Sequence, residues 1–142
     1  LHLAWGGLPN YRSAHHLESE MPKHAAFLES CILGGMNRVV VAGTCFEYGL
    51  QSGELDETAP VRPITAYGLA KHSLHRHLLH LRERHAFGLG WLRPFYLYGD
   101  GQAATSLYAQ LRTAIDSGSH GFDMSHGDQV RDFLPVESRH LR

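Results

Sequence analysis

The sequence lacks the features that mark several large classes of protein. Its 13 lysines and arginines are balanced by 14 aspartates and glutamates, giving a net charge of −1 with neutral histidines. There is therefore no basic surplus of the kind that binds nucleic acid or an anionic membrane surface. No apolar run is long enough to span a bilayer, and no signal peptide is recognisable. These absences predict a cytoplasmic protein without nucleic-acid or membrane partners.

Cysteine is scarce, whereas histidine is abundant. Cys31 and Cys45 are a single pair without metal-site spacing, and we expect both to be reduced thiols. Four of the 12 histidines crowd one predicted helix: His72, His75, His77 and His80. Because no cysteine or carboxylate completes a ligand set, we interpret these histidines as a solvated polar face and predict no metal site.

The pattern that is present alternates strands with helices. Hydrophobic residues make up 43% of 142 positions, enough for one globular core. Apolar residues recur at helical spacing in three segments, about 13–33, 65–85 and 105–117. Strand-like composition marks four others, 1–4, 38–43, 89–98 and 128–136. This alternation predicts an α/β fold with a parallel sheet.

Two strands carry more detailed predictions. The continuous β-branched run over 38–43 is typical of a strand that is buried on both faces of a parallel sheet. Pro94 is expected to end the hydrogen-bond ladder of the strand over 89–98, since proline has no N–H to donate.

Tyr67 and Lys71 form a candidate acid/base pair. A separation of four residues places the phenol and the ammonium on one helix face, one turn apart. A phenol titrates near pH ~10, so a nearby cation is needed to stabilise its phenolate at neutral pH. The same spacing also occurs in ordinary amphipathic surface pairs, so the pair gains meaning only from its context.

That context is a series of phrases that resembles one family, the extended short-chain dehydrogenase/reductases, and within it the nucleotide-sugar epimerase/dehydratase group. Five phrases match in order: His2-Leu3-Ala4, Val41 to Gly49, Tyr67-x-x-x-Lys71, Leu92 to Gly99, and Val130 to Val136. The resemblance implies a partial doubly wound, Rossmann-type parallel sheet. Residues 1–100 would be the C-terminal part of the dinucleotide-binding domain, and residues 101–142 the start of a small substrate domain.

The resemblance also implies roles for particular residues. Thr44 would hydrogen-bond the sugar hydroxyl or ketone, and Tyr67 would be the general acid/base. Lys71 would bind the nicotinamide ribose and, together with the positive nicotinamide, depress the tyrosine pKa. The substrate would be a nucleotide-linked sugar, oxidised or reduced at a ring carbon with NAD or NADP. A 4-ketoreductase or 4-dehydrogenase and a 4-epimerase fit equally, each in surface-polysaccharide assembly.

Further positions follow from the same resemblance. Leu3, Ala4, Pro94 and Phe95 would line the cofactor, although the leucine, alanine and phenylalanine fit a plain core equally well. Arg131 would contact the nucleotide-sugar pyrophosphate, or else pair with a neighbouring carboxylate. Tyr96 stands where family members usually carry asparagine, so the sugar pocket should differ.

Two departures limit the expected activity. Cys45-Phe46 replaces the acidic pair of the 4,6-dehydratases, which argues against water elimination. No glycine-rich phosphate loop occurs in the sequence, so we expect this chain to bind its cofactor poorly or not at all. The expectation is a piece of a longer enzyme, with an inactive fragment or a non-catalytic binding module as the alternative. A homodimer through the helices over 13–33 and 65–85 is also expected.

Overall fold

The computed structural model describes residues 1–124, 126 and 130–136. The chain divides into two compact units between Pro94 and Phe95. The functional division of the chain at residue 100 stays a prediction.

The first unit is built on a small parallel sheet. Strand β1 (Arg38–Ala42) pairs with β2 (Gly88–Leu92) in parallel, with Arg38 opposite Gly88. The N-terminal segment adds an isolated parallel bridge, in which the His2 N–H donates to Val40 O at 2.7 Å and the Ala42 N–H donates to His2 O at 3.0 Å. The sheet therefore runs from the N-terminal segment through β1 to β2.

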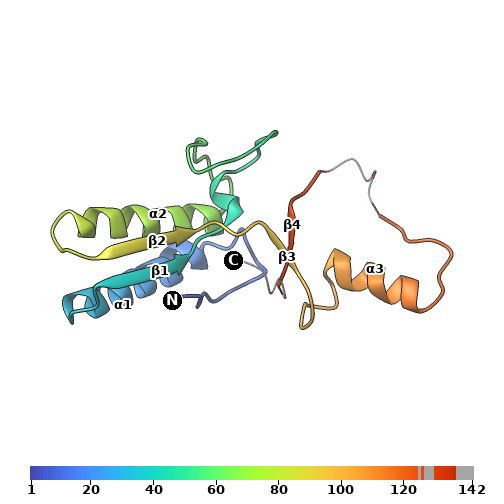
Figure 1. The fold of residues 1–142 in the computed structure, drawn as a ribbon, viewed down its shortest axis with the longest axis horizontal. Helices are drawn as coiled ribbons and strands as arrows, with labels where there is room; N and C mark the ends of the chain where they lie inside the picture. Colours follow the sequence, from blue (N-terminus) through green and yellow to red (C-terminus); the bar gives the residue numbers. More distant parts are fainter. Residues whose placement is uncertain (125, 127–129, 137–142) are drawn as a thin grey trace, which may run out of the picture. The chain divides into compact units, whose positions relative to one another are not determined.

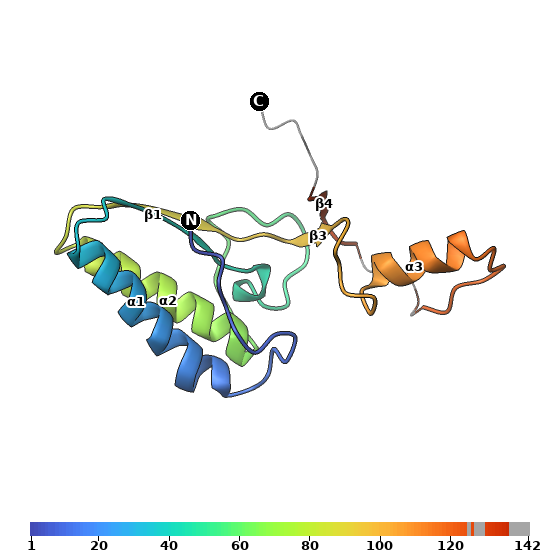
Figure 2. The same ribbon diagram turned by 90° about the horizontal axis from the view of Figure 1, so that it is seen from below.

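Two long helices cover one face of this sheet. A short π-helix, η1 (His16–Glu20), leads directly into α1 (Met21–Leu33), and α2 (Ala66–Arg82) packs beside α1. Figures 1 and 2 show both helices on the same side of β1 and β2. The core between the layers consists of Ala25, Leu28, Ile32, Val39, Val41, Leu74, Leu78, Leu81 and Phe87. The sequence-predicted helices are confirmed, each with slightly shorter bounds.

Two predictions about strands are wrong in detail. Val39 and Val41 are buried but Val40, between them, is 37% exposed, so β1 is covered on one face only. The segment 1–4 is not a buried strand, because Leu1 is 82% and Leu3 64% exposed and only His2 bridges to β1. Both segments keep apolar side chains exposed, because the helices of this chain cover only one face of the sheet. The two cysteines are free, as expected.

The second unit contains a smaller parallel pair and one helix. Strand β3 (Tyr96–Tyr98) pairs with β4 (Phe133–Pro135), and α3 (Leu107–Asp116) lies between them in the sequence. Pro94 lies between β2 and β3, which confirms that it interrupts the ladder. Positions 128 and 129 of the strand predicted over 128–136 lie outside the described residues. The parallel α/β class is confirmed.

Glu20 fastens the N-terminal loop to the helical layer. Its carboxylate is 4% exposed, accepts a hydrogen bond from the Gly6 N–H at 2.6 Å and lies 3.2 Å from His24 Nε2. The Gly6 hydrogen bond is the main reason that the Glu20 pKa is lowered to about 2. A carboxylate with a depressed pKa contributes stability above its unfolded pKa, and this stability is lost as the pH falls.

We expect Glu20→Gln to lower the free energy of unfolding at pH 7 by about 1–3 kcal/mol, the usual cost of weakening a buried charge-assisted hydrogen bond. The difference from wild type should shrink as the pH falls from 4.5 towards about 2, where Glu20 takes up a proton. Urea unfolding across this pH range measures it, with the exposed Glu18→Gln as control. A difference that stays constant with pH would contradict the assignment.

Candidate functional site

Thr44 lies in the loop that leaves the carboxyl end of β1. It is the N-cap of a single turn of 3-10 helix, η2 (Cys45–Glu47), and its hydroxyl accepts a hydrogen bond from the Phe46 N–H at 3.3 Å. The Thr44 N–H in turn donates to Glu47 Oε1 at 2.9 Å, which completes a reciprocal capping box. This turn holds Thr44, 6% exposed, at the edge of the sheet where ligands bind in open α/β folds.

The first turn of α2 brings Tyr67 to the same place. Thr65 caps the helix by accepting a hydrogen bond from the Gly68 N–H at 3.1 Å, and the Tyr67 N–H donates to Tyr11 O at 3.0 Å. Tyr67 is 8% exposed, and its phenol lies close enough to the Thr44 side chain for that side chain to offset part of the rise in the phenol pKa that burial causes. The two hydroxyl groups predicted to act on one substrate oxygen are therefore adjacent.

Gly68 is what allows the helix to come so near. A Cβ at this position would lie 2.5 Å from Phe46 O and 3.2 Å from Thr65 Oγ1, and the nearer of these is backbone that cannot swing away. The absence of a side chain lets α2 pack against the Thr44 turn at backbone distance.

Gly68→Ala is expected to separate α2 from this turn and to destabilise the fold by about 1–3 kcal/mol, as overpacking usually does. Gly88→Ala is the matched control, because a Cβ there would meet nothing nearer than Arg38 Cγ at 3.7 Å. Unfolding in urea gives both values. Equal stabilities of the two variants would show that α2 does not depend on this close approach.

Burial dominates the electrostatics of Tyr67. Desolvation raises the pKa of its phenol to about 12, and the hydrogen bond from Thr44 offsets only part of this rise. The aromatic rings of Trp5, Tyr11 and Phe46 lie with their centroids 6.0, 5.5 and 5.9 Å from the Tyr67 ring. The depressed tyrosine pKa expected from the resemblance is therefore not a property of this chain alone, because the apolar surroundings favour the neutral phenol.

Lys71 lies one turn further along α2 and points to the end of β1. Its ammonium donates to Ala42 O at 2.8 Å and lies 4.1 Å from the ring centroid of Trp5. The residue is 2% exposed, and burial lowers the pKa of its amine to about 8, against the opposing effect of the Glu47 carboxylate. Thr44, Tyr67 and Lys71 thus form one buried group, as predicted for their shared action.

The predicted cofactor-lining residues of the first unit lie near this group or along its edge. Pro94 O accepts a hydrogen bond from the Cys45 N–H at 3.2 Å, which places Pro94 beside the Thr44 turn. Leu3 and Ala4 are exposed, immediately after the bridge at His2. Their exposure is compatible with contact to a ligand, and their cofactor role stays a prediction.

The remaining predicted residues belong to the second unit. Phe95 is half-buried, and the side chain of Arg131 donates a hydrogen bond to the Tyr96 hydroxyl while its guanidinium lies 4.6 Å from the Tyr96 ring centroid. The structure thus brings the two predicted substrate-binding residues, Tyr96 and Arg131, into contact with each other. Their relation to a substrate, and that of Phe95 to a cofactor, stay predictions.

The interpretation of the histidines of α2 needs correction. His72, His75 and His77 are half-buried, and only His80 is exposed, so they are not a solvated face. The His75 ring stacks on Trp91 at 4.5 Å, and burial lowers the pKa of His75 to about 4.

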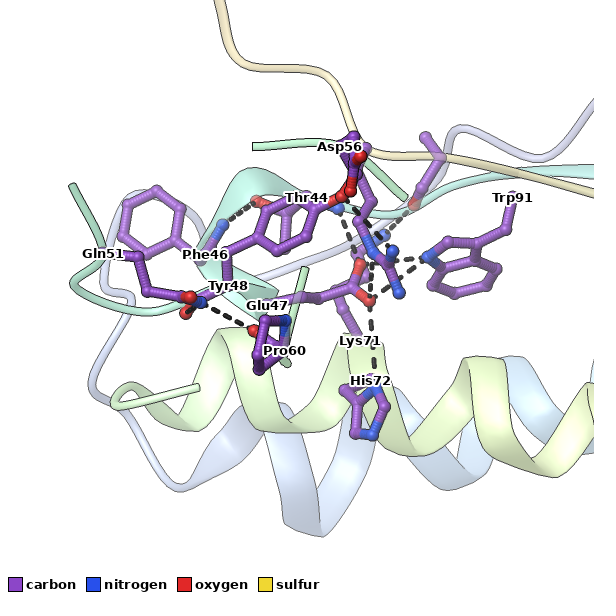
Figure 3. Close-up of polar contacts among 12 residues, drawn as sticks. Thr44, Phe46, Glu47, Tyr48, Gln51, Asp56, Pro60, Lys71, His72 and Trp91 are labelled. Atoms are coloured by element: carbon purple, nitrogen blue, oxygen red, sulfur yellow. Dashed lines mark hydrogen bonds and ion pairs between the residues drawn. The ribbon is translucent and has the colours of Figure 1, made fainter. Parts of the chain in front are cut away.

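The prediction that no carboxylate joins these histidines is also wrong, because Glu47 lies close to two of them. One ligand atom each from Glu47, His72 and His75 lie within 4.8 Å of one another. Both oxygens of Glu47, however, already accept hydrogen bonds, Oε1 from Trp91 (Figure 3) and Oε2 from Arg93. The positive guanidinium of Arg93 at this point disfavours a second cation.

Sequence reasoning missed Trp5, which covers Lys71, and Glu47, which underlies the Thr44 turn. A signal for Glu47 was available, because Thr44-Cys45-Phe46-Glu47 has the Thr-x-x-Glu spacing of a capping box. No local signal points to Trp5, since its contact depends on a residue 66 positions away on α2.

Several known proteins have sequences or structures similar to this chain. The chain is 32% identical over 143 residues to a dTDP-6-deoxy-L-talose 4-dehydrogenase (NAD(+)) from Aggregatibacter actinomycetemcomitans, covering 100% of this chain and 53% of that protein. It is similar to the structure of MoeE5 in complex with UDP-glucose and NAD, with 29% identity and a TM-score of 0.73 over 94% of this chain and 47% of that one.

A UDP-N-acetylglucosamine 4-epimerase from Methanobrevibacter ruminantium, 21% identical, has the same fold, with a TM-score of 0.76 over 94% of this chain and 46% of the epimerase. The chain thus spans about half the length of the relatives it matches. The family model that matches covers residues 10–138, including the Thr44 turn, the Tyr67 helix and Arg131. The chain belongs to the NAD dependent epimerase/dehydratase family.

Proposed function

We propose that the protein is an NAD-dependent oxidoreductase or epimerase of a nucleotide-linked sugar, acting at the sugar C4. The observation that carries this proposal is the buried group of Thr44, Tyr67 and Lys71 at the carboxyl end of β1. Support also comes from the 32% identical 4-dehydrogenase, which is named for NAD(+) and a dTDP-linked deoxy sugar.

The proposed chemistry assigns each side chain a task. Bound NAD would provide the hydride acceptor, and its reduced form the hydride donor. Tyr67 passes the proton between its hydroxyl and the sugar oxygen, and Thr44 holds that oxygen by a hydrogen bond. Lys71 keeps its positive charge beside Tyr67, which favours the phenolate once a ligand joins the site.

The residues present fit the nicotinamide side of such a cofactor. A lysine ammonium has three donors, and one of these is taken by Ala42 O, so Lys71 retains donors for ribose hydroxyls. No glycine-rich loop occurs in this sequence, so contacts with the pyrophosphate of the cofactor are not assigned to this chain. We infer NAD rather than NADP, because the 4-dehydrogenase and MoeE5 are both named with NAD.

Substrate binding would involve the second unit. Arg131 carries a planar cation suited to the pyrophosphate of a nucleotide sugar, and its contact with Tyr96 would orient it. Tyr96 would shape the sugar pocket. We favour a 4-dehydrogenase or 4-ketoreductase over a 4-epimerase, because the 32% identical relative is a 4-dehydrogenase. We also propose a role in surface-polysaccharide assembly.

Location and assembly are part of the same proposal. Among the described residues, no helix combines the length and apolarity needed to cross a bilayer, and we propose that the enzyme works in the cytoplasm. A homodimer through α1 and α2 would have to use their outer faces, since Leu74, Leu78 and Leu81 are at most 1% exposed within the unit. Phe27, 55% exposed, and Leu69, 42% exposed, remain available on these helices.

The test uses the protein as its natural source produces it. Purified protein is incubated with dTDP- or UDP-linked sugars and NAD, and reduced nicotinamide is followed by its absorbance. Net reduction identifies a dehydrogenase, whereas a change of C4 configuration without net reduction identifies an epimerase. Neither product with any of these sugars would favour the alternative, a binding module that has kept the fold without catalysis.

A further inference from the structure

Glu47 is the most completely buried carboxylate near the site. It is 0% exposed, although it lies only three residues after Thr44 in the turn that leaves β1. A buried carboxylate is costly unless its oxygens are fully hydrogen-bonded. The donors that bond to its two oxygens therefore indicate its role.

Those partners come from two separate parts of the first unit. The Thr44 N–H donates to Oε1 at 2.9 Å from within the same turn. The Trp91 Nε1–H of β2 donates to Oε1 at 3.0 Å, and Arg93 Nε just after β2 donates to Oε2 at 3.0 Å. Figure 3 shows the Glu47 carboxylate between Thr44 and Trp91, above His72. The carboxylate thus ties the Thr44 turn to the neighbouring strand.

This tie acts on the Thr44 amide itself. Its neighbours are bonded directly to the β2 side, since the Gly43 N–H donates to Leu92 O at 2.6 Å and the Cys45 N–H donates to Pro94 O at 3.2 Å. Between them, the Thr44 N–H donates to Glu47, and Thr44 has the extended backbone geometry of an N-cap, φ −162° and ψ 149°. Because Glu47 is itself bonded to Trp91 of β2 and to Arg93, fixing the Thr44 amide on Glu47 keeps the Thr44 side chain beside Tyr67. A shift of about 1 Å at such a position can cost about 100-fold in rate.

We propose that Glu47 is a positioning residue for the reaction, holding the Thr44 hydroxyl against Tyr67 through the Thr44 amide. This inference rests on the proposed function. It assigns Glu47 no contact with substrate or cofactor, because both of its oxygens are used within the protein.

The test is a double-mutant cycle, with each variant made in the protein at the length that its natural source produces. Glu47→Gln is isosteric, but its NH2 group would face a donor, either that of Arg93 or those of Thr44 and Trp91, so the tie between the Thr44 turn and the β2 side is weakened. We expect kcat to fall about 10- to 100-fold, with KM for NAD within about 3-fold of wild type. Because Glu47 acts through Thr44, adding Glu47→Gln to Thr44→Ala should cost little more than Thr44→Ala alone.

Two further variants make the result decisive. Glu47→Asp keeps a charge for Arg93 but is one methylene too short to reach both partners, so it tests the proposal if Glu47→Gln does not fold. Glu83→Gln removes a carboxylate at the far end of α2, whose side chain is 71% exposed, and should leave kcat unchanged. Losses that multiply in the double variant, or a folded Glu47 variant within about 2-fold of wild type, would overturn the proposal.

A second readout does not need turnover. Three-bond NMR couplings of Thr44 should report a single χ1 rotamer in wild type and an averaged one in Glu47→Gln. If wild type fails to turn over any nucleotide sugar, the proposed function fails, and the couplings still decide the inference. A Thr44 rotamer that is equally fixed in both proteins would overturn the positioning role.

Discussion

Replacing Tyr67 with phenylalanine is expected to lower kcat by about 10²- to 10⁴-fold, the usual contribution of a positioned acid/base group. The change removes one oxygen from a residue that is 8% exposed and whose phenol pKa, raised by burial, is partly lowered again by the Thr44 side chain. The ring remains, so its packing against Tyr11 and Phe46 should persist. Steady-state kinetics of the naturally produced protein with its nucleotide sugar measure the effect.

The control is Tyr11→Phe, which removes the same atom from a neighbouring ring that stacks on Phe46 at 4.6 Å. Circular dichroism should show both variants folded. Comparable turnover of the Tyr67 variant and wild type would remove Tyr67 from the reaction. A loss shared equally by both variants would point instead to the packing of the aromatic rings.

Lys71→Met is expected to abolish activity and, in the protein without cofactor, to raise the free energy of unfolding. Lys71 is 2% exposed, and burial lowers its pKa from 10.5 to about 8, so the folded state bears a cost for holding this charge. Methionine has a similar length without the charge, although it loses the hydrogen bond to Ala42 O. The net gain at pH 7 is about 2 kcal/mol.

The pH dependence follows from the direction of that shift. Between about pH 8 and 10.5 the unfolded chain holds a proton on Lys71 that the folded chain has released, so wild-type stability rises with pH through this window. The advantage of the methionine variant should therefore be largest at pH 7 and disappear above pH 10.5. Urea unfolding over this range measures it.

Lys23→Met is the matched control, because Lys23 is the other lysine of the sequence and its side chain is 68% exposed. Its effect on stability should stay within about 0.5 kcal/mol, as is usual for a surface substitution. A destabilised Lys71→Met protein would mean that the contacts with Trp5 and Ala42 outweigh the cost of burying the ammonium. The expected result, in which the variant gains stability and loses activity, is common where an active site holds a buried charged group.

Local rules in the sequence were sufficient for the elements and for the central pair. Helical periodicity predicted α1, α2 and α3, and the spacing of Tyr67 and Lys71 placed both side chains on one face of α2. Pro94 interrupts the ladder as predicted, because its missing N–H is a property of the residue itself. Each of these outcomes depends on residues within a few positions of one another.

Only the tertiary structure decided which face is covered and which charges are compensated. The sequence predicted β1 as buried on both sides, yet the helices of this chain cover one face and leave Val40 exposed. Lys71 meets Trp5 and Ala42, and Glu47 meets Trp91 and Arg93, across long stretches of chain. Side-chain identity determines local conformation and chemical capacity, but burial and the partners of a charge arise only when distant segments pack together.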